Sequence, residues 1–243
     1  MEIDLSGRVV LVTGGTRGVG LGISEAFRDA GATVVTCSRH EAPGDHVVCD
    51  VRSPSDVQEL VDGIVSRHGR LDVLVNNAGG APYALAADAS PNYHEKIVSL
   101  NLLAPLQLAQ AAHRVMPPGS SIVNVSSVSA LRPSPGTAAY GAAKAGVDSL
   151  TRTLAVEWAP SVRVNSIDVG MVRTEQTDLH YGGEAGVAAI EQTVPLGRMA
   201  TPRDVGNVAV FLASDLAAYV TGSTIEVHGG GETPAFLRAL ETT

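Results

Sequence analysis

The sequence contains only two cysteines, Cys37 and Cys49, among its 243 residues. Two cysteines are too few for a disulfide-stabilised scaffold, and this scarcity is typical of a protein from a reducing compartment. Basic residues are also scarce, with 17 Lys and Arg against 25 Asp and Glu and a formal net charge of -8. A chain of this charge repels nucleic-acid backbones and anionic lipid, so we expect neither nucleic acid nor a membrane as its partner.

Long apolar runs are missing as well. The sequence has no run of about 18 apolar residues, which is the length that a membrane-spanning helix needs. The N-terminal residues include Glu2 and Asp4 but no basic segment, so they do not resemble a signal peptide. Together these absences predict a cytoplasmic protein.

Apolar residues are nevertheless plentiful, since 44% of the chain is hydrophobic and only 17% is charged. This balance predicts a globular protein, and the length fits a single domain over residues 1–243. Short β-branched runs alternate with longer segments of helical period, which favours parallel strands joined by crossover helices. We therefore predict an α/β fold with a doubly wound Rossmann-type sheet of seven mainly parallel strands and helices on both faces. The predicted strands are 9–13, 33–38, 47–50, 73–76, 121–125, 162–167 and 224–227.

The clearest helix signal covers residues 53–69. Ser53 can cap this helix, Pro54 suits its first turn, and Gly69 can end it. An apolar stripe along the segment completes the pattern of a helix that packs on a sheet. The other predicted helices are 19–30, 93–116, 137–158 and 202–214.

Two prolines modify this pattern. Pro105 falls inside the predicted helix 93–116, where it should kink the helix. Pro43 and Gly44 fall in the short segment 39–46, which predicts a turn in place of a crossover helix and a more open flank of the sheet.

A glycine-rich turn follows the first predicted strand. It reads Thr13-Gly14-Gly15-Thr16-Arg17-Gly18-Val19-Gly20 and leads into a predicted helix. Glycines permit a tight turn and close approach of the backbone, and the free N–H groups of a helix N-terminus favour an anion. The turn therefore predicts a phosphate cradle, although its glycine spacing differs from the standard dinucleotide fingerprint. A glycine-rich turn that binds no ligand is the alternative.

The second predicted strand ends in Cys37-Ser38-Arg39, without an acidic residue. An acid near this position usually binds the ribose hydroxyls of NAD, whereas an arginine accommodates the 2′-phosphate of NADP. Arg39, with Arg17 as a second cation, therefore favours NADP(H), while NAD(H) remains the alternative cofactor. In the other interpretation Arg39 is merely solvated.

Polar residues also follow the later strands. Asn76-Asn77-Ala78-Gly79 follows the fourth strand and Ser126-Ser127 the fifth, and ligands of open parallel sheets bind at these carboxyl ends. Tyr140 and Lys144 are four positions apart on the next helix and share one face. The chain has only one other lysine, Lys96, so this pairing is unlikely to be a coincidence.

With these motifs the sequence resembles the short-chain dehydrogenase/reductase family over nearly its whole length. The motifs that carry the resemblance are the glycine turn 13–20, Asp50, the segment 76–79, Asn101, Ser127 and the Tyr140–Lys144 pair. The late segment Pro195-Leu196-Gly197-Arg198 and the pair Thr221-Gly222 also resemble the C-terminal region of the family.

The resemblance implies a catalytic set of Asn101, Ser127, Tyr140 and Lys144. Tyr140 would be the general acid/base, and Lys144 would lower its pKa and bind the nicotinamide ribose. Ser127 would hydrogen-bond the substrate oxygen, and Asn101 would hold a water in a proton relay. Structural roles are the alternatives: a buried Tyr–Lys pair, a loop-capping serine and a packing asparagine.

The resemblance also implies the cofactor-binding residues. Asp50 would bind the adenine amino group with Val51 beside the base, and Asn76 would only bridge strands. The full set is Gly14, Thr16, Arg17, Gly18, Val19, Gly20, Ser38, Arg39, Asp50, Val51, Asn77, Ala78, Gly79, Tyr140, Lys144, Gly170, Val172 and Thr174.

The chain departs from the family pattern at two places. Val169-Gly170 stands where the family usually has Pro-Gly, and the missing proline should loosen the wall beside the nicotinamide. His228-Gly229-Gly230 replaces a common Asp-Gly-Gly, and we assign His228 no catalytic role. We also predict no metal site, because the spacing of His40, His46 and Cys49 matches no standard zinc pattern.

These observations predict an NADP(H)-dependent oxidoreductase that transfers a hydride between nicotinamide and a carbonyl or secondary alcohol, under a substrate lid at 175–200. The resemblance further implies a homotetramer that packs partly through the helices 93–116 and 137–158. A sugar, polyol or steroid reductase and a 3-oxoacyl-carrier-protein reductase are alternatives, the latter needing a cationic patch from Arg132, Arg173 or Arg198. A catalytically silent dinucleotide-binding regulator is an alternative from another class.

Overall fold

The computed structural model describes residues 3–175, 177 and 182–234. Its sheet has seven strands in the order β3-β2-β1-β4-β5-β6-β7, and every neighbouring pair is parallel. The predicted doubly wound fold class is therefore confirmed, with a sheet that is entirely parallel. The strands are β1 Val9–Thr13, β2 Thr33–Ser38, β3 His46–Val48, β4 Val73–Asn76, β5 Ser120–Ser127, β6 Val162–Val169 and β7 Thr224–Val227.

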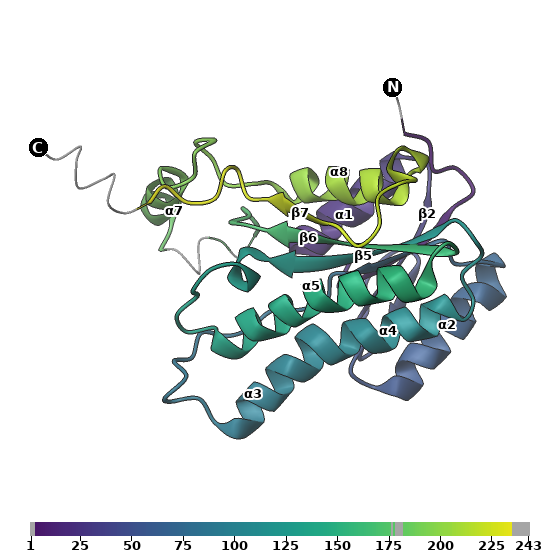
Figure 1. The fold of residues 1–243 in the computed structure, drawn as a ribbon, viewed down its shortest axis with the longest axis horizontal. Helices are drawn as coiled ribbons and strands as arrows, with labels where there is room; N and C mark the ends of the chain where they lie inside the picture. Colours follow the sequence, from purple (N-terminus) through teal and green to yellow (C-terminus); the bar gives the residue numbers. More distant parts are fainter. Residues whose placement is uncertain (1–2, 176, 178–181, 235–243) are drawn as a thin grey trace, which may run out of the picture.

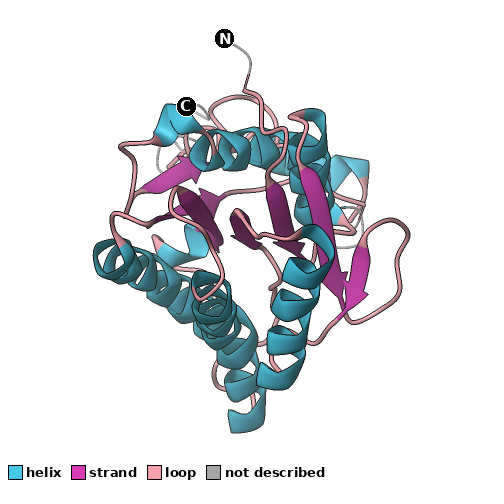
Figure 2. Cartoon of the chain, turned by 90° about the vertical axis from the view of Figure 1, so that its right-hand side faces the viewer, coloured by secondary structure: helices cyan, strands magenta, loops and turns pink. Residues whose placement is uncertain are grey.

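Helices cover both faces of the sheet (Figures 1 and 2). One face carries α1 Gly18–Asp29 and α8 Pro202–Ala213, which bury Ile23, Phe27 and Val205 against the strands. The other face carries α2 Pro54–His68, α4 Ala104–His113 and α5 Ala138–Trp158. The remaining elements are α3 Pro91–Val98, α7 Glu184–Glu191 and the short helical turns η1 Ser99–Leu103, η2 Val128–Ala130 and η3 Asp215–Ala217.

The α2 helix begins and ends where its sequence signals predict. The Ser53 side chain accepts a hydrogen bond from the backbone N–H of Asp56, Pro54 occupies the first turn, and Gly69 ends the helix in the left-handed conformation with φ 77°. This agreement arises because each signal is local and needs no information about packing.

The predicted helix 93–116 is instead interrupted. It forms α3, a π-helical turn η1 and α4, so the irregularity lies before Pro105 rather than at it. Pro105 has no N–H to donate to the carbonyl of Asn101 four residues earlier, and its ring crowds that carbonyl. The proline therefore widens the preceding turn, which contains Asn101.

Three strand ends near the site differ from the prediction. β5 and β6 each continue two residues further, to Ser127 and Val169, because these residues pair with each other in the ladder, so Ser126-Ser127 end the fifth strand rather than follow it. The third strand ends at Val48 rather than at Asp50, because Asp50 starts a turn in which its carbonyl accepts a hydrogen bond from the N–H of Ser53. Residues 39–45 form no helix, as the sequence predicts.

The carboxyl ends of the strands gather at one edge of the sheet. In Figure 1 the arrowhead of β5 points toward this edge, on the side of the molecule where α7 lies. In the part of the chain that the structure describes, no helix is both long and apolar enough to cross a membrane.

Candidate active site

The turn between β1 and α1 depends on its glycines. Gly14 has φ 63° and Gly18 has φ 52°, a left-handed backbone conformation that glycine adopts without strain. A Cβ at Gly20 would lie 2.2 Å from the carbonyl oxygen of Gly14 and 2.5 Å from Nδ2 of Asn77. No larger residue fits at position 20, so the backbone of this turn stays open to a ligand.

Hydrogen bonds join this turn to the end of β4. The hydroxyl of Thr13 accepts hydrogen bonds from the N–H groups of Asn77 (3.0 Å) and Ala78 (2.9 Å). Asn77 donates from Nδ2 to the carbonyl of Thr13 at 2.9 Å. Two chain segments that are distant in sequence therefore form one rigid wall. The predicted bridging role of Asn76 is also found, since Nδ2 donates to Oδ1 of Asn124 on the neighbouring strand at 2.8 Å.

A cleft of about 680 Å³ runs along the carboxyl edge of the sheet. Every residue that the sequence analysis assigns to the dinucleotide lines it, and so does Ser127. The predicted residues in its wall are Gly14, Thr16, Arg17, Gly18, Val19, Gly20, Ser38, Arg39, Asp50, Val51, Asn77, Ala78, Gly79, Tyr140, Lys144, Gly170, Val172 and Thr174.

The sequence analysis missed other residues that line the same cleft. They include Cys37, Cys49, His40, Glu41, Arg52 and Glu175. Most of them directly adjoin an assigned residue in the chain. Their position near the carboxyl end of a strand was therefore the signal that could have identified them. Glu41 places a negative charge in the wall that contains Arg39, which a search for an acid at the end of the strand overlooks.

The assigned adenine ligand, Asp50, is already paired. Its two carboxylate oxygens accept hydrogen bonds from Nε (2.9 Å) and Nη2 (2.5 Å) of Arg52. This side-chain hydrogen bonding holds the pKa of Asp50 below its ordinary value. Asp50 is therefore an ionised and oriented acceptor in the cleft wall.

Ser127 and Tyr140 meet at the other end of the cleft, where β5 ends and α5 begins. Burial raises the pKa of Tyr140 above its ordinary value, and a hydrogen bond with Ser127 opposes this shift. The expectation that Lys144 lowers this pKa is wrong for the chain by itself, because burial of the phenol dominates. Ser127 also caps η2, since its Oγ accepts a hydrogen bond from the N–H of Ser129 at 3.2 Å.

Lys144 lies one turn of α5 beyond Tyr140, with Nζ 5.5 Å from the centroid of the Tyr140 ring. Nζ donates a hydrogen bond of 2.7 Å to the carbonyl of Val125, and the side chain is only 3% exposed. Burial lowers the pKa of Lys144 to about 8. The ammonium group is thus fixed beside the phenol. Because its pKa is about 8, it lies within about one pH unit of its midpoint at neutral pH.

Asn101 does not line the cleft itself but connects to it. Its Oδ1 accepts a hydrogen bond from the N–H of Gly80 at 2.8 Å, and its Nδ2 donates to the carbonyls of Gly80 and Ile97. A Cβ at Gly79 would lie 2.7 Å from Oδ1 of Asn101 and 3.4 Å from Nζ of Lys144. Asn101 and Lys144 therefore lie on either side of Gly79, which leaves no space for a side chain there.

The wall at Val169-Gly170 is paired on both sides. β6 continues through Val169, which pairs with Ser127 on β5 and Val227 on β7. The N–H of Gly170 donates to the carbonyl of Val227 at 3.0 Å. The strand ladder therefore continues to the position where the family usually has proline, and the loosening of this wall stays a prediction.

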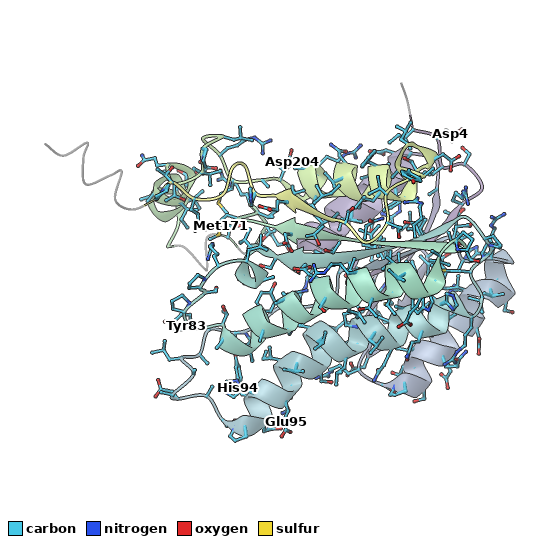
Figure 3. All side chains as sticks on the ribbon, in the orientation of Figure 1. Asp4, Tyr83, His94, Glu95, Met171 and Asp204 are labelled. Atoms are coloured by element: carbon cyan, nitrogen blue, oxygen red, sulfur yellow. The ribbon has the colours of Figure 1, made fainter. Side chains whose placement is uncertain are left out.

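A smaller cavity of about 160 Å³ adjoins the cleft, and Gly170 lines both. Its wall combines apolar side chains with two ion pairs, Arg132 with Glu232 and His228 with Glu226. Met171, labelled in Figure 3, also lines it and lies near α7. His228 follows the last strand, so the strand-end rule would have placed it at this edge. Residues 176 and 178–181 of the predicted lid lie outside the described residues.

Acidic, histidine and cysteine side chains do not gather into a metal-binding group anywhere in residues 3–175, 177 and 182–234. In the region proposed as a rival metal site, Nε2 of His46 instead hydrogen-bonds the carbonyl of His40 at 2.9 Å.

Comparison with known proteins adds a family to this geometry. The profile of a family described as "Enoyl-(Acyl carrier protein) reductase" matches residues 14–232. A short-chain type dehydrogenase/reductase of Sinorhizobium fredii is 37% identical over 238 residues, and the match covers 92% of this chain but only 43% of that relative. A 3-oxoacyl-[acyl-carrier-protein] reductase of Chlamydia pneumoniae is 35% identical over 247 residues, covering 95% of this chain and 99% of that protein.

Solved structures agree with the sequence matches. The ligand-free aldohexose dehydrogenase of Thermoplasma acidophilum superposes with a TM-score of 0.90 and 32% identity, covering 95% of this chain and 96% of that one. The names of these relatives agree on a dehydrogenase or reductase reaction but differ in the substrate.

Proposed function

The chain belongs to the short-chain dehydrogenase/reductase family and is an NAD(P)-dependent oxidoreductase. From this premise we propose that it prefers NADP(H), with NAD(H) as the alternative cofactor, and acts on a carbonyl or secondary alcohol. Tyr140 would be the general acid/base. The observation that carries this proposal is that one cleft is lined by Ser127, Tyr140 and Lys144 at β5 and α5, by the glycine turn after β1, and by Arg39 and Asp50 beyond β2 and β3.

The residues present fit a dinucleotide. The backbone at Gly14, Gly18 and Gly20 forms a cradle that a Cβ would fill or strain, and a helix N-terminus favours phosphate there. When bound, the nicotinamide ring supplies the hydride chemistry. The chain's own part would be to hold the phosphates at α1, the adenosine between Arg39 and Asp50, and the nicotinamide against Gly170 and Val172.

Proton transfer is the task of Tyr140 in this proposal. A phenol whose pKa is raised by burial is protonated at neutral pH and can donate to a carbonyl oxygen as that oxygen gains negative charge. Ser127 would donate a second hydrogen bond to the same oxygen. The protonated phenol therefore suits the acid role that reduction of a carbonyl requires.

Arg39 supports the preference for NADP(H). Arg17 and Arg39 are exposed in the cleft wall, and neither forms an ion pair within the described residues. Both guanidinium groups are therefore available to a 2′-phosphate. Glu41 opposes this attraction, so the preference depends on the balance of these charges.

A small carbonyl compound fits the substrate site better than an acyl-carrier protein. Of the three arginines that could form the required cationic patch, Arg132 pairs with Glu232 and Arg198 pairs with Asp204. A 3-oxoacyl-carrier-protein reductase remains the second candidate, because two relatives carry that name and the description of the matched family profile also refers to an acyl carrier protein.

The remaining predictions concern the whole chain. We propose a single domain, a cytoplasmic location and a homotetramer that uses the helices α4 and α5. Val156 on α5 and Leu103 beside α4 support the last proposal, because they are 81% and 44% exposed. The segment 175–200 is proposed as the substrate lid, and no metal, nucleic acid or membrane is proposed as a partner.

A substrate panel tests this function. Wild-type protein is mixed with NADPH or NADH and with cyclic ketones, sugar-derived ketones or acetoacetyl-coenzyme A, and loss of absorbance at 340 nm is followed. We expect turnover with NADPH on at least one small ketone. Turnover on the thioester alone would favour the second candidate, and tight NADPH binding without any turnover would favour the silent regulator.

A further inference from the structure

Two aspartates are buried beside Lys144 and have no part in the proposed mechanism. Asp148 is 5% exposed and Asp168 is fully buried, while Lys144 itself is 3% exposed. Buried carboxylates are costly unless they are paired with a charge or hydrogen-bonded. Their position therefore calls for an explanation in terms of the charge of Lys144.

The fold directs all three groups into one layer, between α5 and the sheet. Side chains alternate along a strand, and Ile167 and Val169 pack on the face that carries α1 and α8. Asp168 lies between them and therefore points to the opposite face, which α5 covers (Figure 1). Asp148 follows Lys144 by one helical turn and shares its buried face.

Hydrogen bonds confirm this arrangement. Oγ of Ser166, two residues before Asp168, donates to Oδ1 of Asp148 at 3.0 Å. Ser126 is opposite Asp168 in the β5–β6 register, and its Oγ donates to the carbonyl of Lys144 at 3.2 Å. Serines on the two adjacent strands thus bind Asp148 and the backbone of Lys144, and Asp168 lies in the same layer beside both serines.

Asp168 is the less satisfied of the two carboxyl groups. Both of its oxygens are buried and have no hydrogen-bond partner of ordinary geometry among the described residues, although the Ser126 hydroxyl and the Ser127 N–H are close enough to lower its pKa. The nearest compensation is electrostatic: the pKa of Lys144 is lowered by burial, but Asp148 and Asp168 act in the opposite direction. Burial and then Asp148 raise the pKa of Asp168 to about 6.

Other charged groups also influence the carboxyl groups in the layer between α5 and the sheet. Arg152, one turn beyond Asp148 on α5, favours the ionised form of Asp148. Glu226 on β7 is opposite Asp168 in the β6–β7 register and disfavours its ionised form. Tyr140 lies one turn before Lys144 on α5, whereas Asp148 lies one turn after it. Among the described residues, Lys144 is affected by both aspartates, which oppose the lowering of its pKa.

We propose that Asp148 and Asp168 are positioning residues that act through Lys144, because their carboxylates keep its ammonium group charged and fixed beside Tyr140. This inference rests on the proposed function for its effect on catalysis, but its effect on Lys144 is independent of any reaction. It assigns a role to two side chains that contact neither the cleft nor Tyr140.

The two lysines of the chain make a direct test practical. Protein grown with ¹³Cε-lysine gives two signals, one from Lys144 and one from the exposed Lys96, which is an internal control. The signals are titrated without cofactor in wild type, Asp148→Asn, Asp168→Asn and the double variant. Asp62→Asn, on the exposed side of α2, is the matched control.

We expect the Lys144 midpoint to fall by about one pH unit in each single variant and further in the double variant. Lys96 and the Asp62→Asn protein should titrate as in wild type. An unchanged Lys144 midpoint in the double variant would overturn the proposal, because a purely structural role does not move this midpoint.

Wild type provides a second measurement if a variant fails to fold. The Lys144 signal should show an additional inflection near pH 6, where Asp168 titrates, and a single-step titration would overturn the proposal. With the best substrate of the panel, the variants should shift the alkaline limb of the kcat profile by the same amount as the Lys144 midpoint. Loss of turnover in wild type would contradict the proposed function but not these titrations.

Discussion

Single side chains in this site are controlled by burial as much as by their neighbours. Tyr140 and Lys144 are close together, yet burial shifts both pKa values toward the neutral form, upward for the phenol and downward for the ammonium. Removing a charge from water costs more than one favourable contact returns. The phenol therefore begins the reaction with its proton.

Replacing Tyr140 with phenylalanine removes this proton donor and leaves the ring in place. We expect kcat to fall by about 10² to 10⁴, with NADPH affinity nearly unchanged, as measured by steady-state kinetics and cofactor fluorescence. Tyr219→Phe is the control, because Tyr219 is fully exposed and should leave kcat intact. Full activity of Tyr140→Phe would remove the assigned role.

Arg39→Asp tests the cofactor preference. Reversing this charge should weaken NADPH binding at least tenfold, or about 1.4 kcal/mol, and change NADH binding far less. Both affinities can be measured by titration calorimetry. Glu41→Gln is the control from the same wall and should not weaken NADPH. A ratio of NADPH to NADH affinity that Arg39→Asp leaves unchanged would contradict the 2′-phosphate assignment.

The spacing of Tyr140 and Lys144 could be predicted from sequence because it is a helical period within one element. The sign of the Tyr140 pKa shift could not, since it depends on how deeply the fold buries the phenol. The cavity that His228 and Glu226 line could not be predicted for a similar reason, because it forms only when β7 lies beside β6 and near η2.

Among the elements, the β1–α1 turn is the most constrained. Gly20, in the first turn of α1, lies so close to Gly14 that a Cβ has no space, whereas Gly63 in the middle of α2 has open space around it. Replacing these two helical glycines with alanine should therefore have opposite effects on the stability of the fold.

We expect Gly20→Ala to destabilise the fold by about 1–3 kcal/mol through overpacking and to abolish tight NADPH binding. Gly63→Ala should instead stabilise it by about 0.5–1 kcal/mol, because alanine favours the helix. Urea unfolding of both variants measures the difference. Equal stability changes would show that the turn tolerates a Cβ.

Elements were predictable where their signals are local, as in α2 with its serine cap, proline and terminal glycine. The π-helical turn at Ser99–Leu103 was not, because Pro105 indicates an irregularity without fixing on which side of the proline it falls. The third strand ended early because the carbonyl of Asp50 enters a turn, a competition that β-propensity does not describe.

For the whole molecule, the buried carboxyl groups make stability depend on pH. The pKa of Asp168 is raised from 3.8 to about 6 on folding. Between these values the unfolded chain releases a proton that the folded chain keeps, so the contribution of Asp168 to stability falls as pH rises and is lost above about 6.

Asp168→Asn removes this dependence. The melting temperature of the variant, relative to wild type, should therefore increase between pH 4 and pH 7. The corresponding difference in the free energy of unfolding is roughly 3 kcal/mol at most. Differential scanning calorimetry across this range provides the measurement. A constant difference between the two proteins at every pH would contradict the burial of an ionised Asp168.

The parallel sheet and its ligand edge followed from alternation of strands and helices, since crossover connections place all carboxyl ends together. We propose that the dinucleotide lies along that edge with its nicotinamide beside Tyr140. A crystal structure with NADP⁺ tests this most directly. We expect the 2′-phosphate at Arg39, the pyrophosphate over the glycine turn and the nicotinamide between Gly170 and Tyr140. A nicotinamide bound away from Tyr140 and Lys144 would contradict the account.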